Sequence, residues 1–592
     1  MSVYLGQKYT ENRSTNKRGC LSGRMWKYLA GIGFVLFSAG KVEGQPVPFI
    51  DFIQQQHHWV DSVFKGLTPR QRVAQLFMVR AHTNLGTRYM DSVGRIISRE
   101  QLGGIVLFQG GPVRHAQLIN QYQQLVKVPL LAALDGEWGL GMRLPDSTIS
   151  YPYQMTLGAI QDDQLIYRMG REVAKDFRRL GLHINFAPVL DINNNPRNPV
   201  INYRSFGEDK YNVTNKGLAY MRGMMDEGIL VSLKHFPGHG DTDVDSHYDL
   251  PQLNFSRGRL DSLEMFPFGE LIKAGASGVM VAHMNIPALD KTRNLPSSLS
   301  RPVISGILKE QLGFKGLIFT DAMDMKGVIK YFRNGEADIR AVIAGSDILE
   351  LSENSTRAIS LVLKAVEQGR IRQVDVDASV KKILAAKYWL QLQRQPPANL
   401  SGLYRDLNRS SAVRLNQQLA DAAVTLLNSD SLIRRIDFSK HTAIISIGSD
   451  KITDFQQALG RRFDNKLDFL ISGQASADDI GRVANELRRY EQIIVALHDN
   501  RTRPQSLLNY NATVRLFINE LAGRNSIICV FANPYTLAGL PGIEAASCIL
   551  MAYQNESFMQ QAAARVLLKQ LRPTGKLPVT INLFFKYGDG LQ

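Results

Sequence analysis

The segment PLLAALDGE at residues 129–137 is apolar from Pro129 to Leu134 and then carries two carboxylates, Asp135 and Glu137. A strand that is apolar on both faces is typical of a parallel sheet covered by helices on both sides. Similar runs, separated by amphipathic segments, are QLFMVRA (75–81), GGIVLFQG (103–110), INFAPVLDI (184–192), ILVSLKHF (229–236), GVMVAHM (278–284), GLIFTDAMD (316–324) and DILEL (347–351). Eight such units in succession predict an α/β fold, a closed (β/α)8 TIM-like barrel.

The ends of the predicted barrel are also marked in the sequence. Thr68 followed by Pro69 is a helix start signal just ahead of the first apolar run. The polar, proline-containing stretch QRQPPANLSG (393–402) is typical of a linker that leaves a domain. We therefore expect the barrel domain at residues 45–395 and a linker at 396–420.

A second set of apolar runs follows this linker and alternates with helical patterns. These runs are TAIISIG (442–448), KLDFLIS (466–472), QIIVALHD (492–499), SIICVFANP (526–534) and ASCILMAY (546–553). About five parallel strands with intervening helices indicate a smaller α/β sandwich domain, at residues 421–592.

Composition narrows the functional class. The chain has 592 residues, 44% hydrophobic and 21% charged, which is typical of a globular protein and large enough for two domains. Its net charge of +16 fits either affinity for an anionic polymer or scattered solubilising side chains. Neither a phosphate-binding P-loop nor a dinucleotide fingerprint is present, so we predict no nucleotide cofactor. A carbohydrate is the expected partner, and no nucleic acid is expected.

The first 44 residues resemble a secretory leader. The apolar stretch LAGIGFVLFSA (29–39) follows basic residues and precedes KVEG, so cleavage is expected after Gly44. The stretch is too short for a membrane span, and Cys20 lies ahead of it, where it is misplaced for a lipid anchor. We therefore expect an exported protein, periplasmic or extracellular, without an integral span after leader removal. Met25 is a candidate for the true start.

The remaining cysteines, Cys529 and Cys548, lie in apolar runs and match no zinc pattern. They are expected to be small core residues. A disulfide between the two is the alternative.

Polar side chains follow the apolar runs at the point where each predicted strand ends. They are Asp135, Asp191, Lys234 with His235, His283 and Asp321. Active sites of (β/α)8 barrels are built at the carboxyl ends of the strands, so these side chains are expected to share one rim.

The segment KHFPGHGDTDVDSHYDLP (234–251) crowds cationic, imidazole and carboxylate groups into a loop rich in glycine and proline. Zinc binding by His235, His239 and His247 is disfavoured, because Pro237 and Gly238 interrupt the helix that would align two histidines four residues apart. We predict no metal. Asp245 beside His247 is instead typical of an acid/base pair, since the carboxylate orients the imidazole and stabilises its cation.

KHFPGHG with DSH, together with GLIFTDAMDM, resembles glycoside hydrolase family 3 in its β-N-acetylglucosaminidase branch. The resemblance spans roughly residues 65 to 390 and extends to the family's second domain, ending in GKLPVTI (575–581). It implies that Asp321 is the nucleophile, His247 the general acid/base and Asp245 its partner. Asp324 is the competing nucleophile, but it lies further from the end of the predicted strand.

The resemblance also implies sugar-binding roles for Asp135, Arg143, Arg204, Lys234 and His235. The segment LDGEWGLGMR (134–143) departs from the family pattern by Trp138 and Leu140. Trp138 either stacks on a second sugar or packs against the barrel rim.

The expected activity is an exo-acting, retaining hydrolysis of terminal β-linked N-acetylglucosamine from peptidoglycan fragments or chitin-type oligosaccharides, without a cofactor. One alternative is a β-glucosidase or β-xylosidase of the same family, whose acid/base is a glutamate of the second domain. The others are a phosphorylase that uses phosphate as acceptor and a non-catalytic protein that binds wall sugars.

Overall fold

The computed structural model describes residues 47–591. The expected leader at residues 1–44, with Cys20 and Met25, lies outside the described residues. No helix within residues 47–591 has the length and apolar character needed to cross a membrane.

Parallel strands form the first part of the fold. Each of the eight runs expected from the sequence contains a strand, and the run at 229–236 contains two. The strands are β1 (Phe77–Ala81), β2 (Gly104–Leu107), β3 (Leu131–Leu134), β4 (Ile184–Asn185), β5 (Leu230–Val231), β6 (Leu233–Phe236), β7 (Gly278–Val281), β8 (Leu317–Thr320) and β9 (Leu349–Glu350). They pair in the order β5-β4-β3-β2-β1-β9 in one sheet and β6-β7-β8 in another.

The two sheets join into a closed ring. Only Ser232 separates β5 from β6, so these two strands occupy one position in the ring. At the other junction, the N–H of Thr320 donates to the carbonyl of Ile348 at 3.0 Å, and the N–H of Ile348 donates to the carbonyl of Ile318 at 3.0 Å. The TIM-like barrel is thereby confirmed, with an irregularity in its fifth strand.

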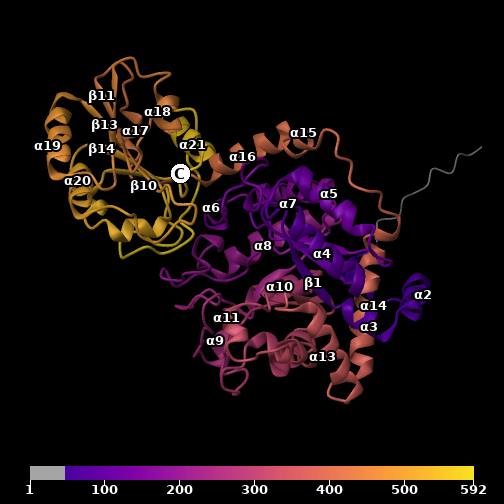
Figure 1. The fold of residues 1–592 in the computed structure, drawn as a ribbon. Coiled ribbons are helices and arrows are strands. Elements are labelled where there is room, and N and C mark those ends of the chain that lie inside the picture. The colour runs from indigo at the N-terminus through magenta and orange to yellow at the C-terminus, as the bar shows by residue number, and fades with distance from the viewer. Residues whose placement is uncertain (1–46, 592) are drawn as a thin grey trace, which may run out of the picture. The chain divides into compact units, whose positions relative to one another are not determined.

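Helices that connect the strands, or follow the last of them, cover the outside of this ring (Figure 1). They are α4 (Thr87–Glu100), α5 (Pro112–Gln123), α7 (Asp163–Leu180), α8 (Lys210–Asp226), α10 (Phe266–Lys273), a π-type helix (Pro302–Gln311), α12 (Glu336–Ala344), α13 (Ser355–Glu367) and α14 (Gln373–Trp389). Shorter helices are α1 (Phe49–Ile53), α2 (His58–Gly66), α3 (Pro69–Ala74), α6 (Gln154–Gly158), α9 (Arg257–Ser262) and α11 (Lys326–Ile329).

Capping residues account for where these helices start and stop. The predicted helix start at Thr68 is observed. The Thr68 side chain accepts a hydrogen bond from the backbone N–H of Gln71, and the Gln71 side chain accepts one from the backbone N–H of Thr68. Asp162 caps the start of helix α7, because its side chain accepts the N–H of Gln164. Gly181 follows the last residue of the helix, and its φ of 83° favours glycine.

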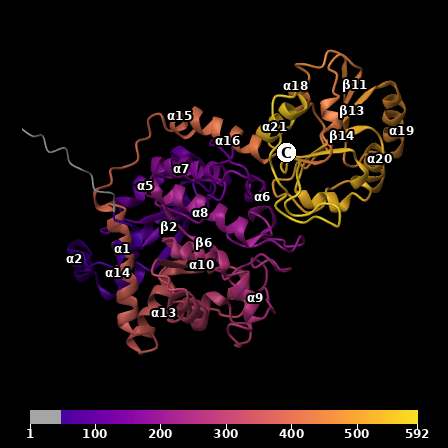
Figure 2. The ribbon, with the colours of Figure 1, turned by 180° about the vertical axis from the view of Figure 1, so that it is seen from behind.

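The second domain is an α/β sandwich (Figure 2). Its strands are β10 (Thr425–Asn428), β11 (Thr442–Ile447), β12 (Lys466–Ile471), β13 (Gln492–His498), β14 (Ser526–Phe531) and β15 (Cys548–Met551), in the order β10-β15-β14-β13-β11-β12. The main helices are α17 (Ser431–Arg434), α18 (Asp454–Leu459), α19 (Ala477–Glu486), α20 (Ala512–Ala522) and α21 (Ser557–Leu567). The five predicted runs are the parallel strands, and β10, which was not predicted, pairs antiparallel with β15.

The segment expected to be a linker, residues 396–420, is largely helical. It contains α15 (Leu403–Leu407) and most of α16 (Ser410–Ala423). Buried Leu415 and Leu419 of α16 explain this difference, because they bury an apolar helical face that the polar composition around residue 396 concealed.

Cys529 and Cys548 are free and buried in the sandwich sheet, so the expectation of two core residues is confirmed and no disulfide joins them.

Candidate active site

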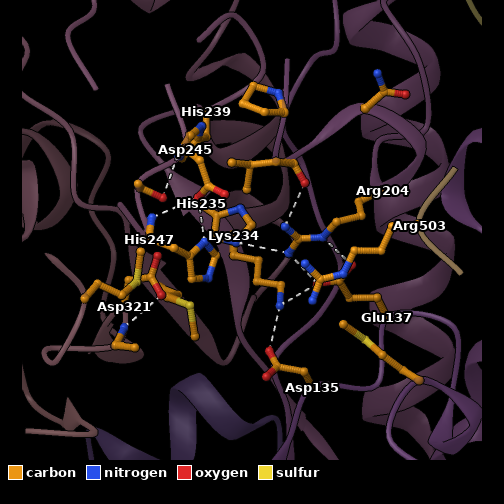
Figure 3. A pocket seen from close by; sticks show the side chains of 18 of the residues that line it. Asp135, Glu137, Arg204, Lys234, His235, His239, Asp245, His247, Asp321 and Arg503 are labelled. Atoms are coloured by element: carbon orange, nitrogen blue, oxygen red, sulfur yellow. Dashed lines mark hydrogen bonds and ion pairs between the residues drawn. The ribbon is translucent and has the colours of Figure 1, made fainter. Parts of the chain in front are cut away.

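A cavity of about 600 Å³ lies at the carboxyl ends of the barrel strands. Its volume is in the range of small-molecule sites. The eight side chains predicted from the sequence all line it: Asp135, Arg143, Arg204, Lys234, His235, Asp245, His247 and Asp321. Figure 3 shows most of them converging on one space from separate strands and loops.

A chain of alternating charges forms one wall of the cavity. Nζ of Lys234 lies 2.8 Å from Oδ1 of Asp135 and 2.8 Å from Oε1 of Glu137. Nη2 of Arg143 lies 2.5 Å from the other carboxylate oxygen of Asp135, Oδ2. Arg204 donates to both carboxylate oxygens of Glu137, from Nη2 to Oε1 at 2.6 Å and from Nε to Oε2 at 2.9 Å. The positions of all five side chains are therefore mutually fixed, as binding of a polar ligand requires.

These ion pairs keep the wall charged despite its burial. Burial opposes ionisation of Glu137, but the charges of Arg204 and Lys234 outweigh it and lower the pKa of Glu137 to about 2. Asp135 shows the same balance, with its pKa held below the ordinary value by Lys234 and Arg143. Both carboxylates are thus ionised acceptors at neutral pH, suited to sugar hydroxyl groups.

His235 is oriented by a buried aspartate. Its Nδ1 lies 2.7 Å from Oδ2 of Asp191, and Oδ1 of Asp191 accepts the backbone N–H of His239 at 2.7 Å. Asp191, at the end of the β4 run, is fully buried. With Nδ1 engaged, Nε2 of His235 points to the cavity beside Arg204, at 3.4 Å from Nη2.

Asp321 directly follows β8, so its side chain enters the cavity from the barrel rim. Its Oδ1 accepts the N–H of Ala322 at 2.8 Å. Burial raises the pKa of Asp321, but the imidazoles of His283 and His235 and this N–H together lower it below the ordinary value. The second carboxylate oxygen has no hydrogen-bond partner among the described residues and is ionised at neutral pH.

Asp324 also lines the cavity, but its carboxylate is committed to another group. Oδ2 of Asp324 lies 2.8 Å from Nη1 of Arg80, a side chain of β1. A carboxylate paired with a guanidinium is a weaker nucleophile than a free one, so the structure favours Asp321 over Asp324 for an attacking role.

Asp245 and His247 lie on the loop between β6 and α9, which contains no helix, as expected from its glycine and proline. Nδ1 of His247 lies 2.7 Å from Oδ1 of Asp245. The imidazole side chain is 61% exposed. The carboxylate fixes the tautomer of the ring and leaves Nε2 available to a ligand.

No group of three or more His, Cys, Asp or Glu side chains within residues 47–591 is placed to hold a metal ion. The buried His239 instead contacts Thr242 through Nδ1 at 2.9 Å and Ser246 through Nε2 at 3.2 Å.

Trp138 both packs and faces the cavity. Its ring meets Tyr153 edge to face at a centroid distance of 4.8 Å and lies 6.2 Å from the ring of Tyr203. Trp138 also lines the cavity. Packing against the barrel rim therefore accounts for one face of its ring only.

The lining residues that were not predicted as site residues include Glu137, Glu350 and Arg503. Glu137 stands two positions after Asp135 in the same strand-end motif, which is the signal that points to it. Arg503 comes from the loop after β13 in the second domain, and no local pattern marks it. Ser506 of the same loop accepts a bond from Asn202 of the barrel at 2.9 Å.

A closed parallel barrel with carboxylates, imidazoles and cations on one rim, followed by an α/β sandwich, defines an enzyme of the glycoside hydrolase type. The chain belongs to glycosyl hydrolase family 3, because the model of that family's N-terminal domain matches residues 68–386.

Known proteins similar to this chain extend over both domains. Beta-hexosaminidase A of Pseudoalteromonas piscicida is 28% identical over 556 residues, which cover 84% of this chain and 92% of that protein. The structure of a family 3 beta-N-acetylglucosaminidase from Paenibacillus sp. is 31% identical, with a TM-score of 0.73, and covers 87% of this chain and 99% of its own. A beta-glucoside phosphorylase, BglX, shares the fold with a TM-score of 0.76 at 21% identity, and covers 90% of this chain and 96% of its own.

Proposed function

We propose that this chain is an exo-acting, retaining glycosidase that removes terminal β-linked N-acetylglucosamine. The observation that carries the proposal is the cavity that Asp321 and the Asp245–His247 pair line together. The similar Pseudoalteromonas protein is named a beta-hexosaminidase, which supports an amino sugar, and the Paenibacillus protein is named a beta-N-acetylglucosaminidase, which supports this particular sugar.

In the first proposed step, the free carboxylate oxygen of Asp321 attacks the anomeric carbon. The glycosidic C–O bond breaks, and the imidazolium of His247 gives its proton to the leaving oxygen. Asp245 stabilises that imidazolium through the contact of 2.7 Å at Nδ1. The product is a glycosyl ester on Asp321.

In the second step, water attacks the anomeric carbon from the face that the leaving group vacated. His247 accepts a proton from this water while the bond to Asp321 breaks. Two inversions restore the β configuration, so the reaction is retaining. Asp135, Arg143, Arg204, Lys234 and His235 hold the sugar hydroxyl and amide groups in this account.

The test is nitrophenol release from the β-N-acetylglucosaminide and the β-glucoside, measured side by side. Strong preference for the acetamido sugar supports the proposal. Preference for the glucoside favours the glucosidase alternative, and absence of turnover with retained sugar binding favours a binding protein. A phosphorylase would be identified by its product: at raised phosphate concentration the reaction would release a sugar phosphate in place of the free sugar.

We further propose that the enzyme is exported and acts on peptidoglycan fragments. The leader-like residues 1–44 support export, and N-terminal sequencing of the mature protein tests it. Arg503 supports a substrate with an acidic group, because its side chain lines the cavity and has no carboxylate partner among residues 47–591. The other cations of the cavity each have such a partner: Arg80, Arg143, Arg204 and Lys234.

Replacement of Arg503 separates the two substrate classes. Arg503→Ala should raise KM for a disaccharide whose leaving sugar carries a carboxylate and leave KM for neutral chitobiose unchanged. An equal effect on both substrates contradicts recognition of an anionic group and favours chitin-type oligosaccharides.

A further inference from the structure

Glu350, the last residue of β9, is a lining residue with no role in the steps above. The residue is 4% exposed and borders the cavity that contains Asp321. Its Oε1 atom is buried and has no hydrogen-bond partner among the described residues. Burying a polar atom without a hydrogen-bond partner costs folding free energy, so the presence of this atom in the wall of a ligand cavity needs an explanation.

The backbone of Glu350 is tied to the segment that carries Asp321. Its N–H donates to Oγ1 of Thr320 at 3.0 Å, and its carbonyl accepts the N–H of Met323 at 2.9 Å. Thr320 and Met323 lie on either side of Asp321 in the chain. Glu350 is thereby held next to the proposed nucleophile, on the wall over which a sugar ring would lie.

The surroundings of Glu350 favour its neutral form. Burial, followed by the negative charges of Asp135 and Asp321, raises the pKa of Glu350 well above its ordinary value, and Lys234 acts in the opposite direction. Arg80 of the neighbouring β1 does not relieve it, because that guanidinium pairs with Asp324. A neutral carboxyl group is a hydrogen-bond donor, which the ionised Asp135 and Asp321 are not.

We propose that Glu350 is a further substrate-binding residue, whose carboxyl group donates a hydrogen bond to an uncharged oxygen of the sugar bound over Asp321. This inference rests on the proposed glycosidase function. The ligand oxygen supplies the missing partner of the buried carboxyl. An anionic substituent at this place is excluded, because Asp135 and Asp321 would repel it.

Two variants of Glu350 distinguish its role as a hydrogen-bond donor from an effect of its charge. Glu350→Gln keeps an N–H donor at the same place, and Glu350→Ala removes it. The matched control is Asp338→Asn, because Asp338 of α12 is also a buried carboxyl, bonded to Ser352, but does not line the cavity. Thermal unfolding of each variant shows whether it folds.

The experiment measures binding of N-acetylglucosamine by titration calorimetry and kcat/KM on the nitrophenyl N-acetylglucosaminide. Glu350→Ala should weaken both by about tenfold to a hundredfold, whereas Glu350→Gln and the control stay close to wild type. Sugar affinity of the wild type should also fall at alkaline pH, where Glu350 ionises, and this fall should be absent in Glu350→Gln.

Three results would overturn the inference: sugar binding by Glu350→Ala equal to wild type, a loss in Glu350→Gln equal to that in Glu350→Ala, or the same alkaline profile in Glu350→Gln and wild type. If Glu350→Ala does not fold, the comparison of the two pH profiles still decides. A wild type that binds the sugar without turnover contradicts the glycosidase proposal alone. A wild type that does not bind it contradicts both.

Discussion

Oδ1 of Asp245 contacts His247 twice, at 2.7 Å from the imidazole Nδ1 and at 2.9 Å from the backbone N. The carboxylate therefore fixes both the position of the residue and the tautomer of its ring. Because the imidazole is 61% exposed, little else in the structure orients it. The proposed acid/base function depends on this one relationship.

His247→Ala should reduce kcat/KM on chitobiose by about 10² to 10⁴ but on an activated aryl glycoside far less, because a good leaving group needs little protonation. Asp245→Asn should act in the same direction, since it removes the partner of Nδ1. His441→Ala, which replaces an exposed histidine of the second domain, is the control. Equal losses on both substrates would contradict the role of general acid.

Glu137→Gln should lower stability at neutral pH, because it leaves Arg204 without its buried carboxylate partner and Lys234 with Asp135 alone. Removing one partner of a buried ion pair costs about 3–5 kcal/mol. The measurement is the melting temperature, compared with that of Glu270→Gln, which removes an exposed carboxylate that contacts Lys273. A drop no larger than in Glu270→Gln would show that the buried network contributes little to folding.

Glu137→Gln should also change how the stability of the protein depends on pH in the acidic range. Folding lowers the pKa of Glu137 from 4.5 to about 2. The ionised form is thus favoured in the folded state, and its stabilisation is complete above pH 4.5 and lost as the pH falls towards 2. The melting temperature of Glu137→Gln should therefore vary less than that of wild type across this range. Parallel acid profiles for the two proteins would contradict the assigned ion pairs.

Lys387 of α14 is fully buried, and its Nζ donates to Oε1 of Gln75 at 2.6 Å. Burial lowers its pKa from 10.5 to about 7, so the unfolded chain binds more protons than the folded one between these values. Stability should rise with pH across that window.

Lys387→Met should therefore be more stable than wild type at pH 6, and the difference should shrink towards pH 10. Melting temperatures over this range test the expectation, with Lys381→Met on the same helix as an exposed control. A difference that is constant with pH would show that Lys387 is not the titrating group.

The barrel was predictable from the sequence because burial on both strand faces produces continuous apolar runs, and each of the eight runs contains a strand. Two features of the strands escaped prediction. The break of the fifth strand at Ser232 depends on hydrogen bonds from its N–H to the carbonyls of Asn185, the last residue of β4, and of Ala187, two residues further on. The antiparallel β10 is only the four-residue segment TLLN, directly after α16, which no periodicity distinguishes.

Residues that line the cavity were predicted where a local sequence motif contains them, and they were missed where their neighbours in space are distant in the chain. Asp135, Asp245 and Asp321 lie in short motifs at strand ends or in a polar loop. Glu350 ends an ordinary apolar run, and its surroundings come from other strands. Arg503 reaches the cavity only because the second domain contacts the barrel, a tertiary relationship that sequence periodicity does not record.

The central claim is that Asp321 is the nucleophile, and azide rescue tests it most directly. In Asp321→Ala, azide can occupy the vacated space and displace an activated aryl group in a single inversion, so the account predicts restored turnover and an α-glycosyl azide. Asp324→Ala is the matched control and should yield no α-azide. An α-azide from Asp324→Ala, or undiminished hydrolysis by Asp321→Ala without azide, would contradict the account.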